Sequence, residues 1–388
     1  MTGEIYLDNG ATTKLKKEVI EVISSNLSNI YGNASSIHHI GEKSNIVLNN
    51  SRKIIADSLN AENDEIIFTS GGTESNNLAL KGIAFEYEKR KGNKGHLIIS
   101  KIEHDCVLNT AKWLEKRGFE ITQISTDKEG FLDIKELKDS FRENTFLVSI
   151  IHANNEIGVI QNIKEIYNIC KERNVIFHTD ACQSYTKIPI DSSMADMITI
   201  NAHKIHGPKG IGALYIKKGI KIVPLLHGGG HERNLRSGTE NVPSIAGFAE
   251  AVKQSPSKEK LIEMEILRDY LIKELLKIPN TKLNGPIKNR LPNNVNVSFA
   301  SIEGEAILGV LDLMGICAST GSACSSRTLD PSHVMMSIED NPERAHGSVR
   351  LTLSEFTTKE EVDKAIEALK IAVNKLRKIS PLGVENNV

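Results

Sequence analysis

Short apolar runs rich in β-branched residues alternate with helix-length segments between about residues 65 and 216. The runs lie at residues 66–69, 97–100, 119–125, 146–151, 175–178, 197–200 and 213–216. Such alternation is typical of βαβ units with a parallel sheet. Because the runs have few polar positions, each predicted strand should be covered on both faces. The sequence therefore predicts an α/β fold, with a mainly parallel central sheet and helices on both faces.

A second, smaller domain is expected because the chain has 388 residues, more than the ~250–300 at which a single hydrophobic core stops growing. After about residue 251 the pattern changes to a charged helix at 258–277, a strand at 294–298 and a closing helix at 358–377. We therefore expect a large domain over residues 13–251 and a smaller α+β domain formed by residues 1–12 and 252–388.

The charge balance and the cysteines exclude several classes of protein. The chain has 49 acidic and 48 basic residues, a net charge of −1, and no block of like charge, so neither a nucleic-acid binder nor a membrane-surface binder is expected. A basic leader and an apolar run of ~18 residues are both missing, so a cytoplasmic protein is predicted. The five cysteines form no Cys-x-x-Cys pair, which argues against a disulfide framework and against a metal site.

Polar residues follow the predicted strands where ligands usually bind, because open parallel sheets bind ligands beyond the carboxyl ends of their strands. The segment 70–75 is rich in glycine and opens a helix, whose free N–H groups favour a phosphate. The alternative is a plain turn in which Thr73 caps the helix. Since this segment contains no lysine, it is not a Walker loop.

Asp180 and Lys204 follow neighbouring predicted strands and suggest a cofactor site. A carboxylate at a strand end can keep a pyridinium nitrogen protonated, although an isolated Asp there is often a helix cap. A buried lysine can form a Schiff base, although a lysine near Gly and Pro is usually solvated. Neither residue decides the question alone.

The ordered set of motifs resembles the cysteine desulfurase family, a branch of the class V aminotransferase group among fold-type I pyridoxal-phosphate enzymes. The resemblance runs nearly end to end and is closest to the housekeeping and nitrogen-fixation subgroup. It rests on the motifs at residues 6–13, 31–33, 71–76, 103–104, 154–158, 180–183, 203–204, 236–241 and 321–324.

This resemblance implies pyridoxal 5'-phosphate as cofactor and L-cysteine as substrate. Lys204 would hold the cofactor and move the substrate's Cα proton, and His104 would stack on the ring and assist proton transfer. Arg350 would bind the substrate carboxylate, as suits a bidentate guanidinium. The remaining implied contacts are Asp180 to the ring nitrogen, Gln183 to the ring hydroxyl, Asn155 to the hydroxyl and the substrate, Gly72, Thr73, Asn201 and His203 to the phosphate, and Thr239 from the second subunit of a homodimer.

Cys324, in a small polar segment at about 318–330 that is typical of a loop, would take the substrate sulfur as a persulfide and leave L-alanine. An iron–sulfur scaffold protein or a tRNA-thiolation enzyme would then accept the sulfur. The other cysteines are interpreted as buried and inert. Asn201 stands where the family usually has Ser or Thr, which puts the phosphate contact there in question. An aminotransferase or a non-enzymatic relative on the same fold remains the alternative.

Overall fold

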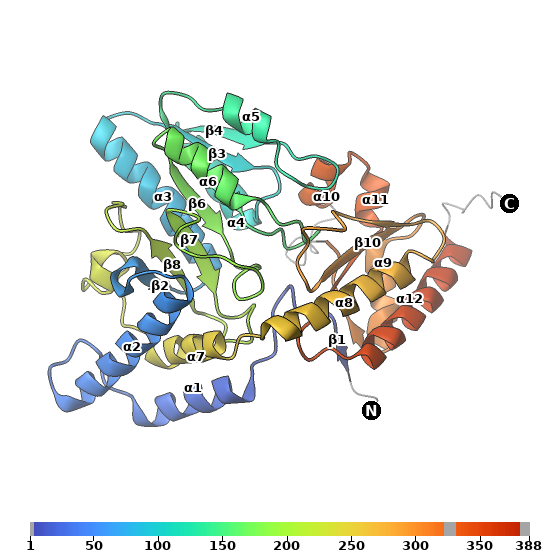
Figure 1. The fold of residues 1–388 in the computed structure, drawn as a ribbon, viewed down its shortest axis with the longest axis horizontal. Coiled ribbons are helices and arrows are strands. Elements are labelled where there is room, and N and C mark those ends of the chain that lie inside the picture. Colours follow the sequence, from blue (N-terminus) through green and yellow to red (C-terminus); the bar gives the residue numbers. More distant parts are fainter. Residues whose placement is uncertain (1–3, 322–330, 381–388) are drawn as a thin grey trace.

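The computed structural model describes residues 4–321 and 331–380, so Cys324 lies outside the described residues. The large sheet has the strand order β2-β8-β7-β6-β5-β3-β4 (Figure 1). Its strands are β2 (Ile66–Thr69), β3 (His96–Ser100), β4 (Glu120–Ile124), β5 (Thr145–Ile151), β6 (Ile176–Asp180), β7 (Met197–Asn201) and β8 (Gly212–Ile216). Each strand lies within one or two residues of a predicted run.

Strands β4, β3, β5, β6 and β7 run parallel to one another, as predicted. Strand β8 is antiparallel to both β7 and β2. The connection between β7 and β8 therefore turns back at the carboxyl end of β7, and this connection contains His203 and Lys204.

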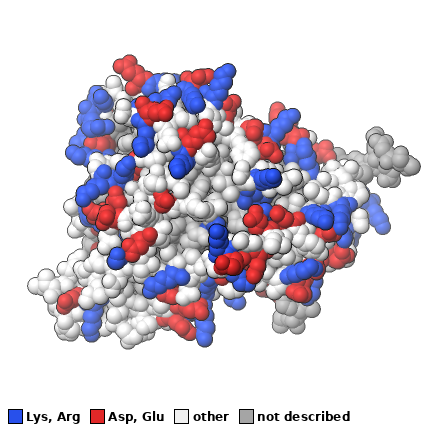
Figure 2. Space-filling view, in the orientation of Figure 1, with Lys and Arg blue, Asp and Glu red and all other residues white. Residues whose placement is uncertain are grey.

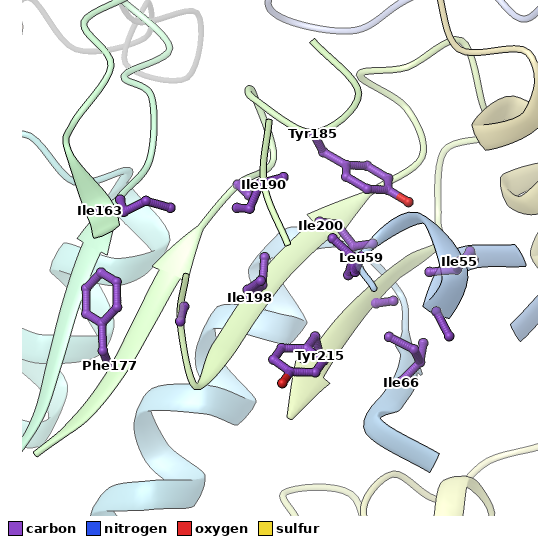
Figure 3. Packing of buried hydrophobic residues seen from close by; sticks show 14 of the residues in the cluster. Ile55, Leu59, Ile66, Ile163, Phe177, Tyr185, Ile190, Ile198, Ile200 and Tyr215 are labelled. Carbon is purple, nitrogen blue, oxygen red and sulfur yellow. The ribbon is translucent and has the colours of Figure 1, made fainter. Parts of the chain in front are cut away.

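Helices cover both faces of the large sheet, because alternate strand residues point to opposite faces. Ile67, Leu97 and Ile99 pack with helices α3 and α4, whereas Ile66, Phe68 and Ile98 belong to the core under α2, α6 and α7. Figure 3 shows part of the core under α2, α6 and α7, in which Ile55 of α2 and Leu59, directly after that helix, lie near Ile66, Ile198 and Tyr215 of the sheet. The helices of this region are α1 (Lys17–Asn29), α2 (His39–Ser58), α3 (Gly72–Lys91), α4 (Asp105–Glu115), α5 (Ile134–Asp139), α6 (Ile163–Glu172) and α7 (Val242–Lys253).

A second sheet follows in the later part of the chain, with the antiparallel order β12-β10-β9. The predicted helices at 258–277 and 358–377 are found as α8 (Lys258–Leu275) and α12 (Lys359–Ile379), and the predicted strand is β10 (Asn294–Phe299). The other elements are β9 (Thr281–Leu283), α9 (Gly304–Leu313), β11 (Ile316–Cys317), α10 (His333–Ile338), α11 (Pro342–His346) and β12 (Ser348–Thr352). This sheet and α8, α9 and α12 share a core of their own.

The N-terminal segment joins this second core rather than the first. Strand β1 (Ile5–Tyr6) pairs in parallel with β11, and Leu7 is buried among the residues of the second core. The following residues run toward the large sheet, where Thr13 Oγ1 donates to His203 O over 2.9 Å. The segment 8–13 therefore bridges the two sheets.

The molecular surface is mixed in charge. Figure 2 shows acidic and basic side chains interspersed on one face of the molecule. Within residues 4–321 and 331–380, no helix is long and apolar enough to cross a membrane.

Candidate active site

A cavity of about 280 Å³ opens at the carboxyl ends of β5, β6 and β7, the edge where parallel sheets bind ligands. Most of the predicted site residues line it, although they come from both sheets and from the segments between them. They are Gly72, Thr73, His104, Asn155, Asp180, Gln183, Asn201, His203, Lys204 and Arg350. Thr239 is exposed and does not line this cavity.

Helix α3 points its N-terminus at the cavity through Gly72 and Thr73. The cap residue is Gly71, with φ +152° and no side-chain cap, so the alternative in which Thr73 caps the helix is wrong. A Cβ at Gly72 would lie 2.6 Å from Cys182 Sγ, so only glycine fits without displacing that thiol. The first N–H groups of the helix have no helical partner and favour an anion.

Lys204 projects into the cavity from the β7–β8 connection. Its Nζ donates to the backbone oxygens of Gly10 and Ala11, at 2.8 Å for Ala11. The neighbouring His203 contacts Thr12 Oγ1 at 3.3 Å. Burial, and then the charge of Lys204, lowers the pKa of His203 to about 4, so this imidazole is neutral at pH 7.

Asp180 is the last residue of β6 and is almost fully buried. Its Oδ1 accepts from Cys182 N at 2.9 Å, and its Oδ2 accepts from Asn76 Nδ2 at 2.6 Å. Gln183 follows in a turn, and its Nε2 donates to Gly10 O over 2.9 Å. Two donors thus orient the carboxylate at the edge of the cavity.

His104 both caps helix α4 and lines the cavity. Its Nδ1 accepts a hydrogen bond from Cys106 N at 3.1 Å. Because Nδ1 is the acceptor, the neutral ring carries its proton on Nε2. The structural and functional interpretations of this histidine are therefore compatible.

Arg350 reaches the cavity from β12 of the second sheet, and its residue is 1% exposed. Its Nη2 donates to Asp8 Oδ1 at 3.1 Å, and its Nη1 donates to Asn155 O at 3.0 Å and to Gly321 O at 3.3 Å. The Nε atom is buried and has no hydrogen-bond partner among residues 4–321 and 331–380. The guanidinium is thus fixed in place and also connects the second sheet to the segment that contains Asn155.

Asn201 ends β7 and is 3% exposed. Its Nδ2 lies 3.5 Å from the position that a Cβ on Gly72 would take, which brings the amide close to the start of α3. Its Oδ1 is buried without a partner.

Sequence reasoning missed Asn76, Cys106, Glu156 and His333, which also line the cavity. Cys106 and Cys182, expected from the sequence to be buried, are partly buried, and both line the cavity. For Asn76 a signal existed, since it lies one helical turn after Gly72 and faces the same side of α3.

The residues present fit pyridoxal phosphate. The cavity combines a lysine amine, a carboxylate at a strand end and a helix N-terminus without a side-chain cap. Within the described part of the chain, three of its side chains have buried polar atoms without partners, namely Asn76 Oδ1, Asn201 Oδ1 and Arg350 Nε. Because buried polar groups are normally hydrogen-bonded, such a cavity suits a polar ligand.

Comparison with known proteins agrees with this chemistry. The family model "Aminotransferase class-V" matches residues 5–365. The cysteine desulfurase IscS of Dictyoglomus turgidum is 51% identical over 386 residues, which cover 98% of this chain and 97% of that protein. The cysteine desulfurase IscS of Methanosarcina thermophila is 50% identical over 382 residues, covering 97% and 94%.

Solved structures show the same fold. A NifS-like protein, 37% identical, superposes with a TM-score of 0.90 over 96% of this chain and 100% of that one. SspA, solved in complex with cysteine, is also 37% identical and has a TM-score of 0.81 over 91% of this chain and 100% of that one. Matches of this length and identity show that the chain belongs to the class V aminotransferase family and, within it, to the pyridoxal-phosphate-dependent cysteine desulfurases.

Proposed function

We propose that this protein converts L-cysteine to L-alanine and takes the sulfur onto Cys324 as a persulfide, for delivery to an iron–sulfur scaffold protein or a tRNA-thiolation enzyme. The observation that carries the proposal is the meeting of Lys204, Asp180 and Arg350 at one cavity. An amine, an anchored carboxylate and a buried guanidinium are what an amino-acid substrate and a pyridine cofactor need. The names of the relatives favour cysteine among amino acids.

Pyridoxal phosphate, when bound, withdraws electrons from the substrate's α-carbon. The amine of Lys204 would hold it and then move the Cα proton, while Asp180 would face the ring nitrogen and Gln183 the ring hydroxyl. The start of α3, His203 and Asn201 would contact the phosphate. The position of each of these residues at the cavity supports the role that the resemblance implies for it.

Arg350 would bind the carboxylate of cysteine, and this orients the substrate. Its guanidinium is already oriented by Asp8 and by the backbone of Asn155, so little side-chain entropy remains to be lost on binding. Asn155 would contact the substrate from the same side. His104 would donate from Nε2, because its Nδ1 is already an acceptor.

The sulfur step uses the thiolate of Cys324, which attacks the sulfur of the bound cysteine. The S–S bond forms as the Cβ–S bond breaks, and the electron pair of the broken bond stays on Cβ. A proton then takes the place of sulfur there, which gives alanine. Turnover requires an external thiol or an acceptor protein to remove the persulfide sulfur.

Replacing Cys324 separates the sulfur step from cofactor binding. Cys324→Ala should bind pyridoxal phosphate with wild-type affinity and bind cysteine, yet release no alanine, because no nucleophile receives the sulfur. The wild type without reductant should give a burst of about one alanine per site and a mass increase of one sulfur atom. Alanine and protein mass are measured together after rapid mixing.

Cys317→Ala is the matched control, because Cys317 lies in β11 and does not line the cavity. It should keep both the burst and the added mass. Alanine release by Cys324→Ala at the wild-type rate would instead favour a direct lyase without a protein thiol.

We also propose a homodimer in which Thr239 completes the cofactor site of the partner subunit. Thr239 is exposed and lies outside the cavity of its own chain, which suits a residue that contacts a second copy. The α1–α2 region exposes Leu27, Tyr31 and Ile37, and Figure 2 shows few charged side chains at the corresponding lower left. Apolar surface of this kind favours association.

We also propose that the chain divides into two domains, one formed by residues 13–251 and the other by residues 1–12 and 252–388. The separate hydrophobic cores of the two regions support this division.

A further inference from the structure

Asn76 lies between the start of α3 and the end of β6, and its residue is fully buried. Its Nδ2 donates to Asp180 Oδ2 at 2.6 Å and also lies 3.1 Å from Cys106 Sγ. Its Oδ1 is buried without a partner. Both N–H bonds of the amide are therefore used, one of them on the Asp180 carboxylate.

Cys106 extends these contacts to the histidine of the site. Its Sγ lies 3.1 Å from His104 Nδ1 as well as 3.1 Å from Asn76 Nδ2. A continuous series of contacts thus runs from His104 on α4, through Cys106 and Asn76, to Asp180 on β6. The two side chains expected on the face and at the nitrogen of the cofactor ring are connected by this series.

Three titratable groups near Asp180 have pKa values shifted by burial. Burial, and more weakly the charge of Asp180, raises the pKa of Glu103 to about 8. Burial lowers the pKa of His178 to about 4, and burial with Asp180 raises that of the Cys182 thiol well above its usual value. At pH 7 these three groups are uncharged.

We propose that Asn76 is a positioning residue that holds the Asp180 carboxylate directed at the ring nitrogen of pyridoxal phosphate. The inference rests on the proposed function, in which Asp180 pairs with that nitrogen. The physical reason is that an amide N–H donor fixes the orientation of the carboxylate oxygen that accepts from it. Asn76 also holds one oxygen while Cys182 N holds the other, so the carboxylate cannot rotate.

An amide at position 76 differs from a carboxylate in a way that can be tested. In Asn76→Asp two carboxyl groups would meet at hydrogen-bond distance, and such a pair shares a proton because both cannot ionise. The two carboxyl groups would then share one negative charge, so Asp180 would carry less of it, although the side chain at position 76 keeps its size. In Asn76→Leu the hydrogen bond is lost without a new charge.

The experiment compares Asn76→Asp, Asn76→Leu and the control Asn77→Asp with wild type. Each purified variant is used in the oligomeric state that the wild type adopts. Asn77 is the next residue of α3, and its Nδ2 donates to Thr73 O near the helix surface, so the control adds the same charge away from Asp180. Cofactor affinity is measured by equilibrium dialysis, and the visible absorption of the bound cofactor is followed from about pH 5 to pH 9.

Both Asn76 variants should bind pyridoxal phosphate about tenfold or more weakly than wild type, as expected when a hydrogen bond to a charged group is lost. The visible band of Asn76→Asp should also acquire a pH-dependent transition that wild type and Asn77→Asp lack. Loss of a neutral packing contact would not produce that transition. Circular dichroism confirms that each variant is folded, and if one fails to fold the other still decides the affinity comparison.

Asp180→Asn distinguishes failure of this inference from failure of the proposed function. If Asp180→Asn alters affinity and spectrum while both Asn76 variants match the control, the inference is overturned and the role of Asp180 stands. If neither Asp180→Asn nor the Asn76 variants change anything, the role of Asp180 and that of Asn76 are overturned together.

Discussion

Glu103 is a carboxyl group kept uncharged inside the protein. Its Oε1 accepts from Ser100 Oγ at 2.5 Å and from Ile151 N at 2.8 Å, while its Oε2 is buried without a partner. Burial is the main cause that raises its pKa to about 8, against the hydrogen bonds that lower it. Since the ordinary pKa of a glutamate is ~4.3, the folded protein keeps a proton that the unfolded chain loses.

This difference makes stability depend on pH. Between about pH 5 and pH 8 the folded state binds more protons at Glu103 than the unfolded state, so this group makes the free energy of unfolding fall as the pH rises. Glu103→Gln removes the ionisation. The stability of the variant relative to wild type should therefore increase by on the order of 1–3 kcal/mol across that window, as measured by urea denaturation.

The comparison of the two proteins at each pH cancels the other titrating groups. A stability difference that stays constant from pH 5 to pH 8 would mean that Glu103 is already ionised in the folded protein.

Single residues at strand ends could be predicted from sequence, whereas the contacts that their supporting residues make with them could not. Lys204 and Asp180 follow neighbouring parallel strands, and strand direction alone brings their positions to one edge. Asn76 and Glu103 act through contacts with residues more than 45 positions away in the chain. Such contacts depend on how α3 and the strands pack, and no local pattern indicates that packing.

At the scale of elements, the site depends on the close approach of β8 to the turn before α3. Gly212 opens β8 and pairs with Thr69, the last residue of β2. A Cβ at Gly212 would lie 2.8 Å from Gly71 Cα and 2.8 Å from Ile200 O. Both neighbours are backbone atoms, so they cannot give way without moving the start of α3.

Gly212→Ala should therefore lower the free energy of unfolding by about 1–3 kcal/mol, the usual cost of overpacking. It should also weaken pyridoxal-phosphate binding, because the helix N-terminus expected at the phosphate moves. Denaturation curves and cofactor dialysis test the two effects.

Gly309→Ala is the control, because Gly309 lies inside α9 and a Cβ there meets nothing within 4 Å. It should stabilise the protein by about 0.4–1 kcal/mol. An equal change in the free energy of unfolding and in cofactor binding for the two variants would contradict the tight contact at Gly212.

At the scale of the whole molecule, the sequence predicted the seven strands of the large sheet but only one strand, β10, of the second sheet. The apolar runs and the helix of 258–277 identified the elements, because their periodicity is local. The pairing of β1 with β11 could not be predicted from two-residue strands that are 311 positions apart in the register Ile5–Ile316. The antiparallel direction of β8 was also missed, because its apolar run resembles that of a parallel strand.

The proposed dimer predicts complementation between two impaired variants. Lys204→Ala loses the residue that holds the cofactor, and Thr239→Ala weakens the site of the partner. In a mixed dimer the Thr239→Ala chain supplies Lys204, and the Lys204→Ala chain supplies Thr239 to the same site. One intact site should therefore form in each mixed dimer.

Refolding the two variants together should raise cofactor retention and the yield of alanine above the sum of the separate proteins. Light scattering establishes the size of the mixed species. A shared site would be contradicted if the mixture retained no more cofactor and yielded no more alanine than the sum of the separate proteins. A fully active monomer would also contradict it.

The segment 8–13 lies between the two sheets and joins the earliest part of the chain to the last. Gly10 N donates to Thr352 Oγ1 at 2.6 Å, while Gly10 O accepts from Gln183 and Lys204. During synthesis the earlier residues leave the ribosome first, yet the partner of Gly10 on β12 is 342 positions further along the chain. A nascent chain that already contains Lys204 but not β12 therefore lacks both this partner and Arg350 of the cavity. Cofactor loading should consequently follow synthesis of β12, and a ribosome-bound chain stalled before β12 should remain colourless.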